Sequence, residues 1–359
     1  MNNSIVEKDL DYIIKKFGQA GLFKDKTVLI TGCAGFIGFY FVQFFCRIAG
    51  QMPLKRLILL DNFMLGKPPW LEKLKDKPLE VDIRAFDISK DDIAAVPSAA
   101  QADYVIHMAS ISSPVFYRQY PLETLDANIL GLRKLLDYYA DKALKGFLFF
   151  SSSEIYGEAP AESIPTNEEY RGHVNSMGPR ACYDEAKRFG ETLCYVFAQT
   201  RHLPARIVRP FNNYGPGMRL DDGRIPADFA KAVMNARDLV MYSDGTPTRT
   251  FCYVADAIVG YLKALVYKDF DYFNIGMDKP EISMKDFALI YLQQAKGLLN
   301  YQGKVAYAIA QDKDFLTHNP SRRCPDISKA RKLLGFSPQI TPEQGVAHFL
   351  EYLVLEKTK

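Results

Sequence analysis

The stretch KTVLITGCAGFIG at residues 26–38 decides the fold class of this 359-residue chain. Its first part, residues 26–31, is a short apolar run of the kind that forms a fully buried strand in a parallel sheet. The run leads into Gly32, Gly35 and Gly38, spaced as G-x-x-G-x-x-G, and a helix-length apolar segment follows to about Ala49. Glycines at such a turn let the backbone approach a pyrophosphate, to which the helix N-terminus offers free amides. The stretch therefore predicts the start of a dinucleotide-binding unit.

The same alternation continues outward from this stretch. Apolar runs at residues 56–60, 79–86, 102–107 and 146–150 predict further buried strands, and residues 122–139 predict a long helix. Strands that alternate with helices imply a parallel sheet covered on both faces, with right-handed crossovers. We therefore expect an α/β fold with a doubly wound parallel sheet of the Rossmann type.

Acidic residues at the ends of the predicted strands fit a dinucleotide. Asp61 ends the second strand, where a carboxylate can hydrogen-bond both ribose hydroxyls and repel a 2′-phosphate, which favours NAD over NADP. Asp87 ends the third strand and could face the adenine, although an ordinary loop cap is nearly as good an interpretation. The predicted cofactor-binding residues are Gly32, Gly35, Phe36, Ile37, Gly38, Asp61, Asn62, Asp87, Ile88, Ala109, Tyr183 and Lys187.

The pattern changes beyond about residue 200, where prolines break the chain into shorter pieces. Residues 226–236, 254–267, 284–299, 327–334 and 342–355 predict helices there. We expect a smaller α/β substrate domain at residues 201–359, partly interleaved with a dinucleotide-binding domain at residues 26–200. Residues 1–25 carry apolar side chains at helical spacing from Ile5 to Phe17, which predicts a short amphipathic helix ahead of the first strand.

Composition and charge exclude several classes of protein. The chain is 48% hydrophobic and 24% charged, which is an ordinary globular balance. Its formal net charge of +3 is too small to attract nucleic acid or an anionic membrane to the surface as a whole. The six cysteines form no CxxC pair and no metal-ligand spacing with histidine, so we expect no metal site, no disulfide framework and a cytoplasmic location. No segment predicts a membrane span or a secretory signal.

The sequence YDEAK at residues 183–187 indicates chemistry. Tyr183 and Lys187 lie one helical turn apart on one face, and an ammonium beside a phenol favours the phenolate. That effect would make the tyrosine a usable base at neutral pH. Ser152, in the SSSE run that ends the fifth predicted strand, could bind the same substrate hydroxyl. A Y-x-x-x-K pair alone arises by chance, but its combination with the glycine motif and the serine run makes chance the weaker explanation.

Together these motifs resemble the extended short-chain dehydrogenase/reductases that act on nucleotide sugars, and within them the UDP-glucuronate decarboxylases. The resemblance covers everything after about residue 25. It is carried by the glycine motif, Asp61, SSSEIYG at 151–157, GPRACYDEAKR at 178–188, RPFNNYGP at 209–216, LDDGR at 220–224, TRTFCYV at 248–254 and RCPDISKA at 323–330.

The resemblance implies a reaction and a set of roles. Tyr183 would take the proton from the sugar 4-hydroxyl, Lys187 would hold the nicotinamide ribose, and Ser152 would position the hydroxyl. The resulting 4-ketone lies β to the 6-carboxylate, which would leave as carbon dioxide while NAD is recycled. Arg249 would lie near the reacting end, to meet the carboxylate or to protonate carbon 5. The implied substrate-binding residues are Asn212, Arg224, Arg249 and Arg323, with the first, second and fourth at the nucleotide diphosphate. The resemblance also implies a homodimer, built through the helices at 122–139 and 183–200.

Ser153 and Glu154 help to choose among relatives. The 4,6-dehydratases have Asp-Glu there, and the aspartate expels the 6-hydroxyl; serine is a poor proton donor for that step. Simple 4-epimerases usually carry a small residue in place of Glu154. The pair therefore favours decarboxylation, although it could also merely cap the strand–loop junction. The predicted catalytic residues are Tyr183, Lys187, Ser152, Ser153, Glu154 and Arg249.

Other positions depart from the family pattern. Phe39-Tyr40 replaces a small polar pair, Arg171 a tryptophan and Ser176 a proline. Three alternatives therefore stay open: a nucleotide-sugar 4,6-dehydratase, an epimerase on another nucleotide sugar, and an NAD-binding sensor without turnover.

Overall fold

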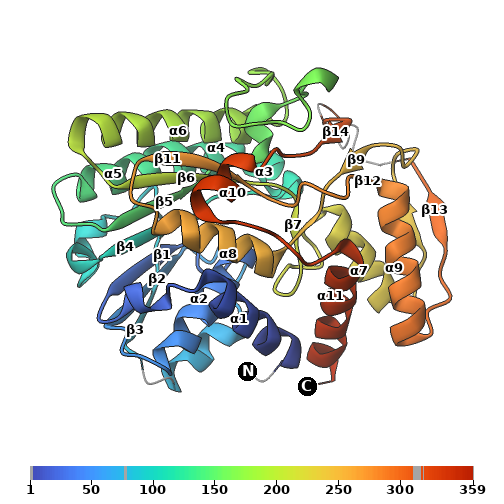
Figure 1. The fold of residues 1–359 in the computed structure, drawn as a ribbon, viewed down its shortest axis with the longest axis horizontal. Helices are drawn as coiled ribbons and strands as arrows, with labels where there is room; N and C mark the ends of the chain where they lie inside the picture. The colour runs from blue at the N-terminus through green and yellow to red at the C-terminus, as the bar shows by residue number, and fades with distance from the viewer. Residues whose placement is uncertain (1–2, 77–78, 310–316, 318, 359) are drawn as a thin grey trace.

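The computed structural model describes residues 3–76, 79–309, 317 and 319–358. A seven-stranded sheet, parallel throughout, forms its centre (Figure 1). In spatial order its strands are β11 (Asp271–Ile275), β6 (Ala205–Pro210), β5 (Gly146–Phe150), β4 (Tyr104–His107), β1 (Thr27–Thr31), β2 (Arg56–Asp61) and β3 (Val81–Ala85). The chain order reverses direction between β1 and β4, and ligands of doubly wound sheets bind in the crevice beyond such a switch point. The expected fold class is confirmed.

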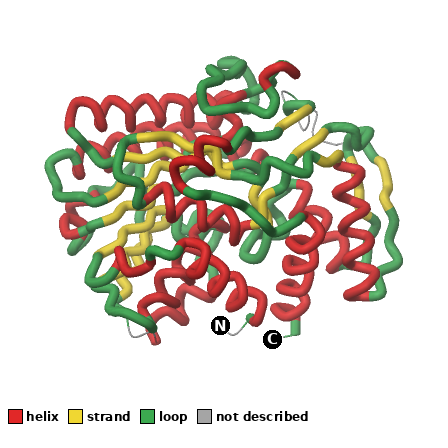
Figure 2. The backbone as a smooth tube through the Cα atoms, viewed as in Figure 1, coloured by secondary structure: helices red, strands yellow, loops and turns green. Residues whose placement is uncertain are grey.

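Helices cover both faces of the sheet (Figure 2). On one face, Val28 and Ile30 of β1 share a core with α1 (Ser4–Phe17), α2 (Phe36–Ala49) and α8 (Val254–Leu265). On the other, Leu29 joins a core with α5 (Leu132–Tyr139) and α6 (Ala181–Arg201). Because neighbouring side chains of a strand point to opposite faces, both cores need apolar residues, and every position of β1 is buried.

The helix predicted over 122–139 is interrupted. It consists of α4 (Pro121–Asp126), a π-helical turn (Ala127–Gly131) and α5. The turn brings Gly131 so close to Ile88 that an added Cβ would lie 2.7 Å from its Cγ2 atom. The wider turn therefore lets the helix pass the loop that follows β3.

The C-terminal half is divided between the sheet and a smaller layer. Strands β6 and β11, which the sequence patterns did not predict, extend the sheet. The predicted helices are present as α7 (Ile225–Met234), α8, α9 (Met284–Leu299), α10 (Ser328–Leu334) and α11 (Pro342–Lys357). Short strands pair beside them: β7 (Asn213–Tyr214) with β10 (Cys252–Tyr253), β8 (Leu239–Met241) with β13 (Val305–Tyr307), and β9 (Thr248–Arg249) with both β12 (Ile282–Ser283) and β14 (Arg322–Arg323). The domain boundary at residue 200 stays a prediction.

The predicted N-terminal helix is α1, and it packs against α2, α8 and α11 (Figure 1). Its Asp9 is 2% exposed and accepts hydrogen bonds from the hydroxyls of Tyr40 (2.6 Å) and Tyr253 (2.7 Å). This contact gives a physical reason for the unusual Tyr40 in α2. Within the described part of the chain, no helix combines the length and the apolarity that crossing a membrane requires.

Candidate active site

A cavity of about 980 Å³ lies beyond the carboxyl ends of the central strands, between the sheet and the smaller C-terminal layer. One wall is the glycine turn after β1, and another is the start of α6 with the turn after β5. Every residue that the sequence predicts to touch cofactor or substrate lines this cavity. The roles of those residues stay predictions, but the fold brings all of them to one place.

The glycine turn is shaped for close approach of a ligand. Gly32 has φ 71°, and a Cβ there would lie 2.8 Å from the Ala109 nitrogen. A Cβ on Gly38 would lie 2.5 Å from the Cys33 carbonyl oxygen, so this position also requires glycine. Helix α2 begins at Phe36 without a side-chain cap on its N-terminus. The turn therefore fits a pyrophosphate held by backbone amides.

The two predicted acidic cofactor ligands have different surroundings. Asp61 accepts hydrogen bonds from the Ala34 and Phe63 amides, at 2.9 Å each, and burial raises its pKa. Asp87 accepts from the Ser89 amide (3.0 Å) and hydroxyl (2.6 Å), as a loop cap does. Both line the cavity, so contact of Asp87 with a cofactor and its capping role are compatible.

The expected catalytic pair stands in the first two turns of α6. Lys187 donates from Nζ to the Phe150 carbonyl oxygen at 2.7 Å, which fixes the ammonium at the end of β5. The hydroxyls of Ser152 and Tyr183 share a hydrogen bond. The Tyr183 ring stacks on Tyr117, with centroids 5.2 Å apart and an angle of 9° between the planes. The phenol is thus held between a serine hydroxyl and an aromatic face.

Lys187 Nζ lies 5.7 Å from the centre of the Tyr183 ring, and its expected effect on the phenol stays a prediction. Burial raises the pKa of Tyr183 to about 12, and the bond to Ser152 only partly opposes this. Burial also lowers the pKa of Lys187 to about 7, so that near neutrality the lysine carries only part of its charge. The two residues share one face of α6, as predicted, and burial moves the pKa of each away from its ordinary value.

Glu154 is the centre of a cluster of buried charges. Arg323 binds it with two parallel hydrogen bonds, Nη1 to Oε1 at 2.5 Å and Nη2 to Oε2 at 2.6 Å. Arg180 donates from Nη2 to the same Oε2 and from Nε to Asp184 at 3.4 Å. Burial would raise the pKa of Glu154, but the charges of Arg180 and Arg323 outweigh it and lower the pKa to about 2. Burial and the charge of Glu154 raise the pKa of Asp184 to about 7.

Arg249 and Arg323 are directly paired residues on the adjacent strands β9 and β14. Like charges in such positions repel. Burial, followed by the charge of Arg323, lowers the pKa of Arg249 to about 9. Its guanidinium donates to the carbonyl oxygens of Thr248 (2.7 Å) and Ser321 (3.2 Å) and to that of Pro320. Arg249 therefore holds the segment that leads to Arg323 as well as lining the cavity.

The other predicted substrate residues, Asn212 and Arg224, also line the cavity. Asn212 donates to the Thr250 carbonyl oxygen at 2.9 Å. Arg224 precedes α7 and forms an ion pair with Asp222, with Nη2 2.8 Å from Oδ2. Arg323, which was expected at the diphosphate together with these two, has both Nη atoms on Glu154.

Three residues of the site were missed by sequence reasoning: Tyr117, Arg180 and Asp184. Arg180 and Asp184 flank Tyr183 within the block of strongest resemblance and are four residues apart, so helical spacing could have placed both beside Glu154. Tyr117 belongs to α3 (Pro114–Gln119), and no spacing connects it with α6. Only the packed fold reveals it.

The chain is similar to known proteins in both sequence and fold. A model of the NAD dependent epimerase/dehydratase family matches residues 28–276. The chain belongs to this family. NAD is therefore its cofactor, as Asp61 predicted. The chain is 33% identical to UDP-glucuronic acid decarboxylase 1 of Xenopus tropicalis, over 91% of this chain and 72% of that protein. It is 32% identical to UDP-glucuronic acid decarboxylase 6 of Arabidopsis thaliana, over 92% of this chain and 88% of that protein.

Solved structures of epimerase/dehydratase type have the same fold. The UDP-glucuronic acid 4-epimerase of Bacillus cereus, solved with UDP-glucuronic acid and NAD, superposes with a TM-score of 0.74 at 25% identity, over 92% of this chain and 99% of that one. An epimerase of Methanothermobacter thermautotrophicus gives a TM-score of 0.80 at 24% identity, over 96% of both chains. The expected extended short-chain dehydrogenase/reductase architecture is confirmed.

Proposed function

We propose that this protein converts UDP-glucuronate to UDP-xylose by transient oxidation at sugar carbon 4 followed by decarboxylation. The relatives named above support a nucleotide-sugar substrate and this reaction. The observation in the chain itself that supports it best is a surplus of buried positive charge at the end of the cavity where Tyr183 and Glu154 lie.

That surplus can be counted residue by residue. Arg180, Arg249 and Arg323 are only 7%, 7% and 8% exposed. Against three cations the cluster holds one firmly ionised carboxylate, Glu154, while Asp184, with a pKa of about 7, is partly protonated at neutral pH. Burying unbalanced charge is costly. A substrate that brings a carboxylate to this end would balance the cluster, and a uronate does so.

Tyr183, Ser152 and Lys187 have separate roles in the oxidation step. As the phenolate, Tyr183 accepts the proton of the sugar 4-hydroxyl, which Ser152 orients through the hydrogen bond that it shares with this tyrosine. Because burial raises the pKa of Tyr183 to about 12, positive charge beside the phenol is needed to favour that form. Lys187, fixed on the Phe150 carbonyl, lies on the same face of α6 and binds the cofactor ribose. When bound at the glycine turn, NAD supplies the acceptor and later the donor of a hydride at carbon 4.

The arginine cluster acts on the other half of the reaction. Once carbon 4 is a ketone, the bond from carbon 5 to the carboxylate breaks, carbon dioxide leaves, and the electron pair remains as an enolate. Arg180 and Arg323, held in place by Glu154, lie where they can stabilise that negative charge. Arg249, whose pKa burial lowers to about 9, gives up a proton more readily than an ordinary arginine and suits the protonation of carbon 5.

Product mass tests the proposal. Purified protein with UDP-glucuronate and NAD should release carbon dioxide and form a UDP-pentose without added reductant. Tyr183→Phe is the control, and it should lose the reaction while still binding NAD. Loss of water would instead indicate a dehydratase, and unchanged substrate with no hydride exchange would indicate a non-catalytic NAD-binding protein.

A second candidate function, epimerisation at sugar carbon 4, is supported by one of the structural relatives. The structural relative from Bacillus cereus is a UDP-glucuronic acid 4-epimerase, so the same substrate could be inverted at carbon 4 with its carboxylate kept. The same experiment decides, because epimerisation leaves the mass unchanged and alters the chromatographic position of the sugar nucleotide. Glu154, where simple epimerases usually have a small residue, favours decarboxylation.

Assembly and location complete the proposal. The outward faces of α4, α6 and the π-helical turn carry exposed apolar side chains: Leu122, Leu130, Phe189 and Val196, 43–70% exposed. A homodimer formed through these helices would cover them. None of the six cysteines, all within the described residues, forms a disulfide, which suits a reducing compartment, and we propose that the protein works in the cytoplasm.

A further inference from the structure

Asn274 connects the two elements that carry Glu154 and Arg323. It lies in β11 and is fully buried. Its Oδ1 accepts a hydrogen bond from the Tyr156 hydroxyl at 2.7 Å. Its Nδ2 donates to the carbonyl oxygens of Thr166 (2.9 Å) and Asp326 (3.1 Å). One amide side chain therefore contacts both the turn that carries Glu154 and the segment that follows Arg323, and it does not line the cavity.

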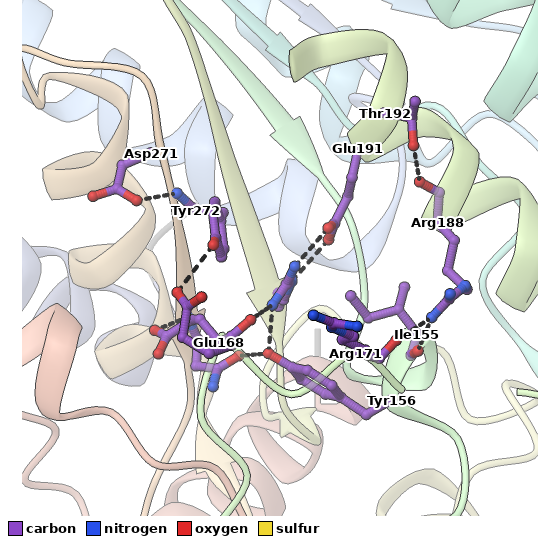
Figure 3. A network of polar contacts seen from close by, with 12 residues as sticks. Ile155, Tyr156, Glu168, Arg171, Arg188, Glu191, Thr192, Asp271 and Tyr272 are labelled. Carbon is purple, nitrogen blue, oxygen red and sulfur yellow. Dashed lines mark hydrogen bonds and ion pairs between the residues drawn. The ribbon is translucent and has the colours of Figure 1, made fainter. Parts of the chain in front are cut away.

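Tyr156 is the link to Glu154, because both belong to the 3₁₀ turn Ser153–Tyr156. Arg209 fixes the Tyr156 hydroxyl by donating to it from Nη1 at 2.7 Å. The same guanidinium binds Glu191 of α6 through Nε (2.8 Å) and Nη2 (2.6 Å), as Figure 3 shows around Tyr156 and Glu191. Arg209 opens the RPFNNYGP motif yet does not line the cavity, so its part in the site has to be indirect.

Asp326 connects Asn274 to Arg323, because backbone hydrogen bonds hold the segment between Arg323 and Asp326 at two points. The Thr166 amide donates to the Cys324 carbonyl oxygen at 2.8 Å, and the Asp326 amide donates to the Thr166 carbonyl oxygen at 2.9 Å. Asn274 binds the carbonyl oxygens of Thr166 and Asp326 together. The segment that follows β14 is therefore held against β11 of the central sheet.

We propose that Asn274, together with Arg209 and Tyr156, is a positioning unit that fixes Glu154 against Arg323. Every polar atom of the Asn274 side chain is used, and such buried, satisfied networks are rigid. The bidentate contact between Glu154 and Arg323 requires both partners in one geometry. The inference rests on the proposed function only in assuming that this pair faces the reacting end of the substrate.

Tyr156→Phe tests the first link, since it keeps the ring and removes only the hydroxyl. We expect kcat to fall by about 10- to 100-fold, as small misplacements of reacting groups do, with the affinity for NAD unchanged. Tyr139→Phe is the matched control: Tyr139 is also fully buried and donates one hydrogen bond, to the Ala99 carbonyl oxygen at 2.9 Å, but has no connection with the site. It should keep wild-type kcat with a similar loss of thermal stability.

The pH profile separates positioning from general damage. A loosened contact with Arg323 lets burial raise the pKa of Glu154, so kcat of Tyr156→Phe should fall at a higher pH on the acid side than kcat of the wild type. The charged or titratable groups that face Glu154 are Arg180, Asp184, Tyr117, Tyr183, Arg224, Arg249 and Arg323, all retained in the variant. A Tyr156→Phe enzyme with the kcat and pH profile of Tyr139→Phe would overturn the inference.

Asn274→Asp tests the second link, and urea unfolding checks that the variant is folded. Its carboxylate still accepts from Tyr156 but can no longer donate to the Thr166 and Asp326 carbonyl oxygens, so it should give the same loss of kcat. Because both changes break one unit, the double variant should be no worse than the worse single variant. Full additivity would contradict the inference. If the wild type epimerises instead of decarboxylating, the proposed reaction fails, and the same variants test the positioning unit on the reaction that is observed.

Discussion

Burial and charge act in opposite directions on the carboxyl of Glu154. Its side chain is 20% exposed, and burial alone would raise its pKa; the charges of Arg180 and Arg323 outweigh burial and lower the pKa to about 2. The pair is thus stabilising above pH 4.5, the ordinary pKa of a glutamate, and this contribution is lost as the pH falls toward 2. The charge balance of the arginine cluster therefore depends mainly on the ionised form of this one carboxylate.

Glu154→Gln should therefore affect activity and stability together. It leaves the Arg323 guanidinium without its anionic partner and Arg180 with Asp184 alone, so the free energy of unfolding at pH 7 should fall by about 3 kcal/mol. We expect kcat to fall by about 100-fold or more, as when a group that stabilises a transition-state charge is lost. Steady-state kinetics and urea unfolding measure the two effects.

Glu158→Gln is the control for this change. Glu158 lies near the same end, is exposed, and accepts hydrogen bonds from the Ser321 amide and hydroxyl, which glutamine can also accept. It should leave both quantities nearly unchanged. A Glu154→Gln enzyme with wild-type kcat would remove Glu154 from the mechanism.

The charged partners of the site show what a sequence can reveal about residues. YDEAK identified Tyr183 and Lys187 because their relation is local to one helix. Arg323 binds a residue 169 positions earlier in the chain, and no spacing rule connects the two. The depressed pKa of Lys187 likewise depends on complete burial by the fold, which a motif does not contain.

Among the elements, helix α1 provides the sharpest test. Burial raises the pKa of its Asp9 to about 7 from an ordinary value of 3.8. Protonated Asp9 thus favours the folded state, and this contribution is lost as the pH rises through about 7. Relative to Asp9→Asn, the wild type should lose up to about 4 kcal/mol of unfolding free energy between pH 4 and 8.

Unfolding measured by urea at several pH values tests this prediction. Asp11→Asn changes an exposed carboxylate of the same helix and should keep the pH dependence of the wild type. Parallel stability curves for wild type and Asp9→Asn would show that α1 does not dock with a buried carboxyl.

The elements also show where sequence patterns fail. Apolar runs predicted β1 to β5 because those strands are buried on both faces. Strand β6 was missed because Arg206 and Arg209 interrupt its apolar run; both are buried and bound, Arg206 to the Pro204 carbonyl oxygen and Arg209 to Glu191. Strand β11 was hidden for the same reason, since its buried Asn274 looks like a loop residue.

At the scale of the whole molecule, the proposed dimer can be broken by one charge. Phe189 is 48% exposed on the outward face of α6, and Phe189→Asp would bury a carboxylate in the interface. Light scattering should give a dimer for the wild type and a monomer for this variant. Leu289→Asp is the matched control, because Leu289 is equally exposed, at 48%, but lies on α9. A wild-type monomer, or a dimer that survives Phe189→Asp, would rule out this interface.

The contacts of α1 also set an order of events during synthesis of the chain. Tyr253, the partner of Asp9, is added to the chain 244 residues after Asp9. Tyr352, the partner of Asn3, is added 349 residues after Asn3. At about 5–20 residues per second, the helix waits on the order of 10–50 s for the first of these. During that time its apolar face lacks most of its partners and is open to chaperones. Helix α1 can therefore complete its packing only after α8 and α11 have been synthesised.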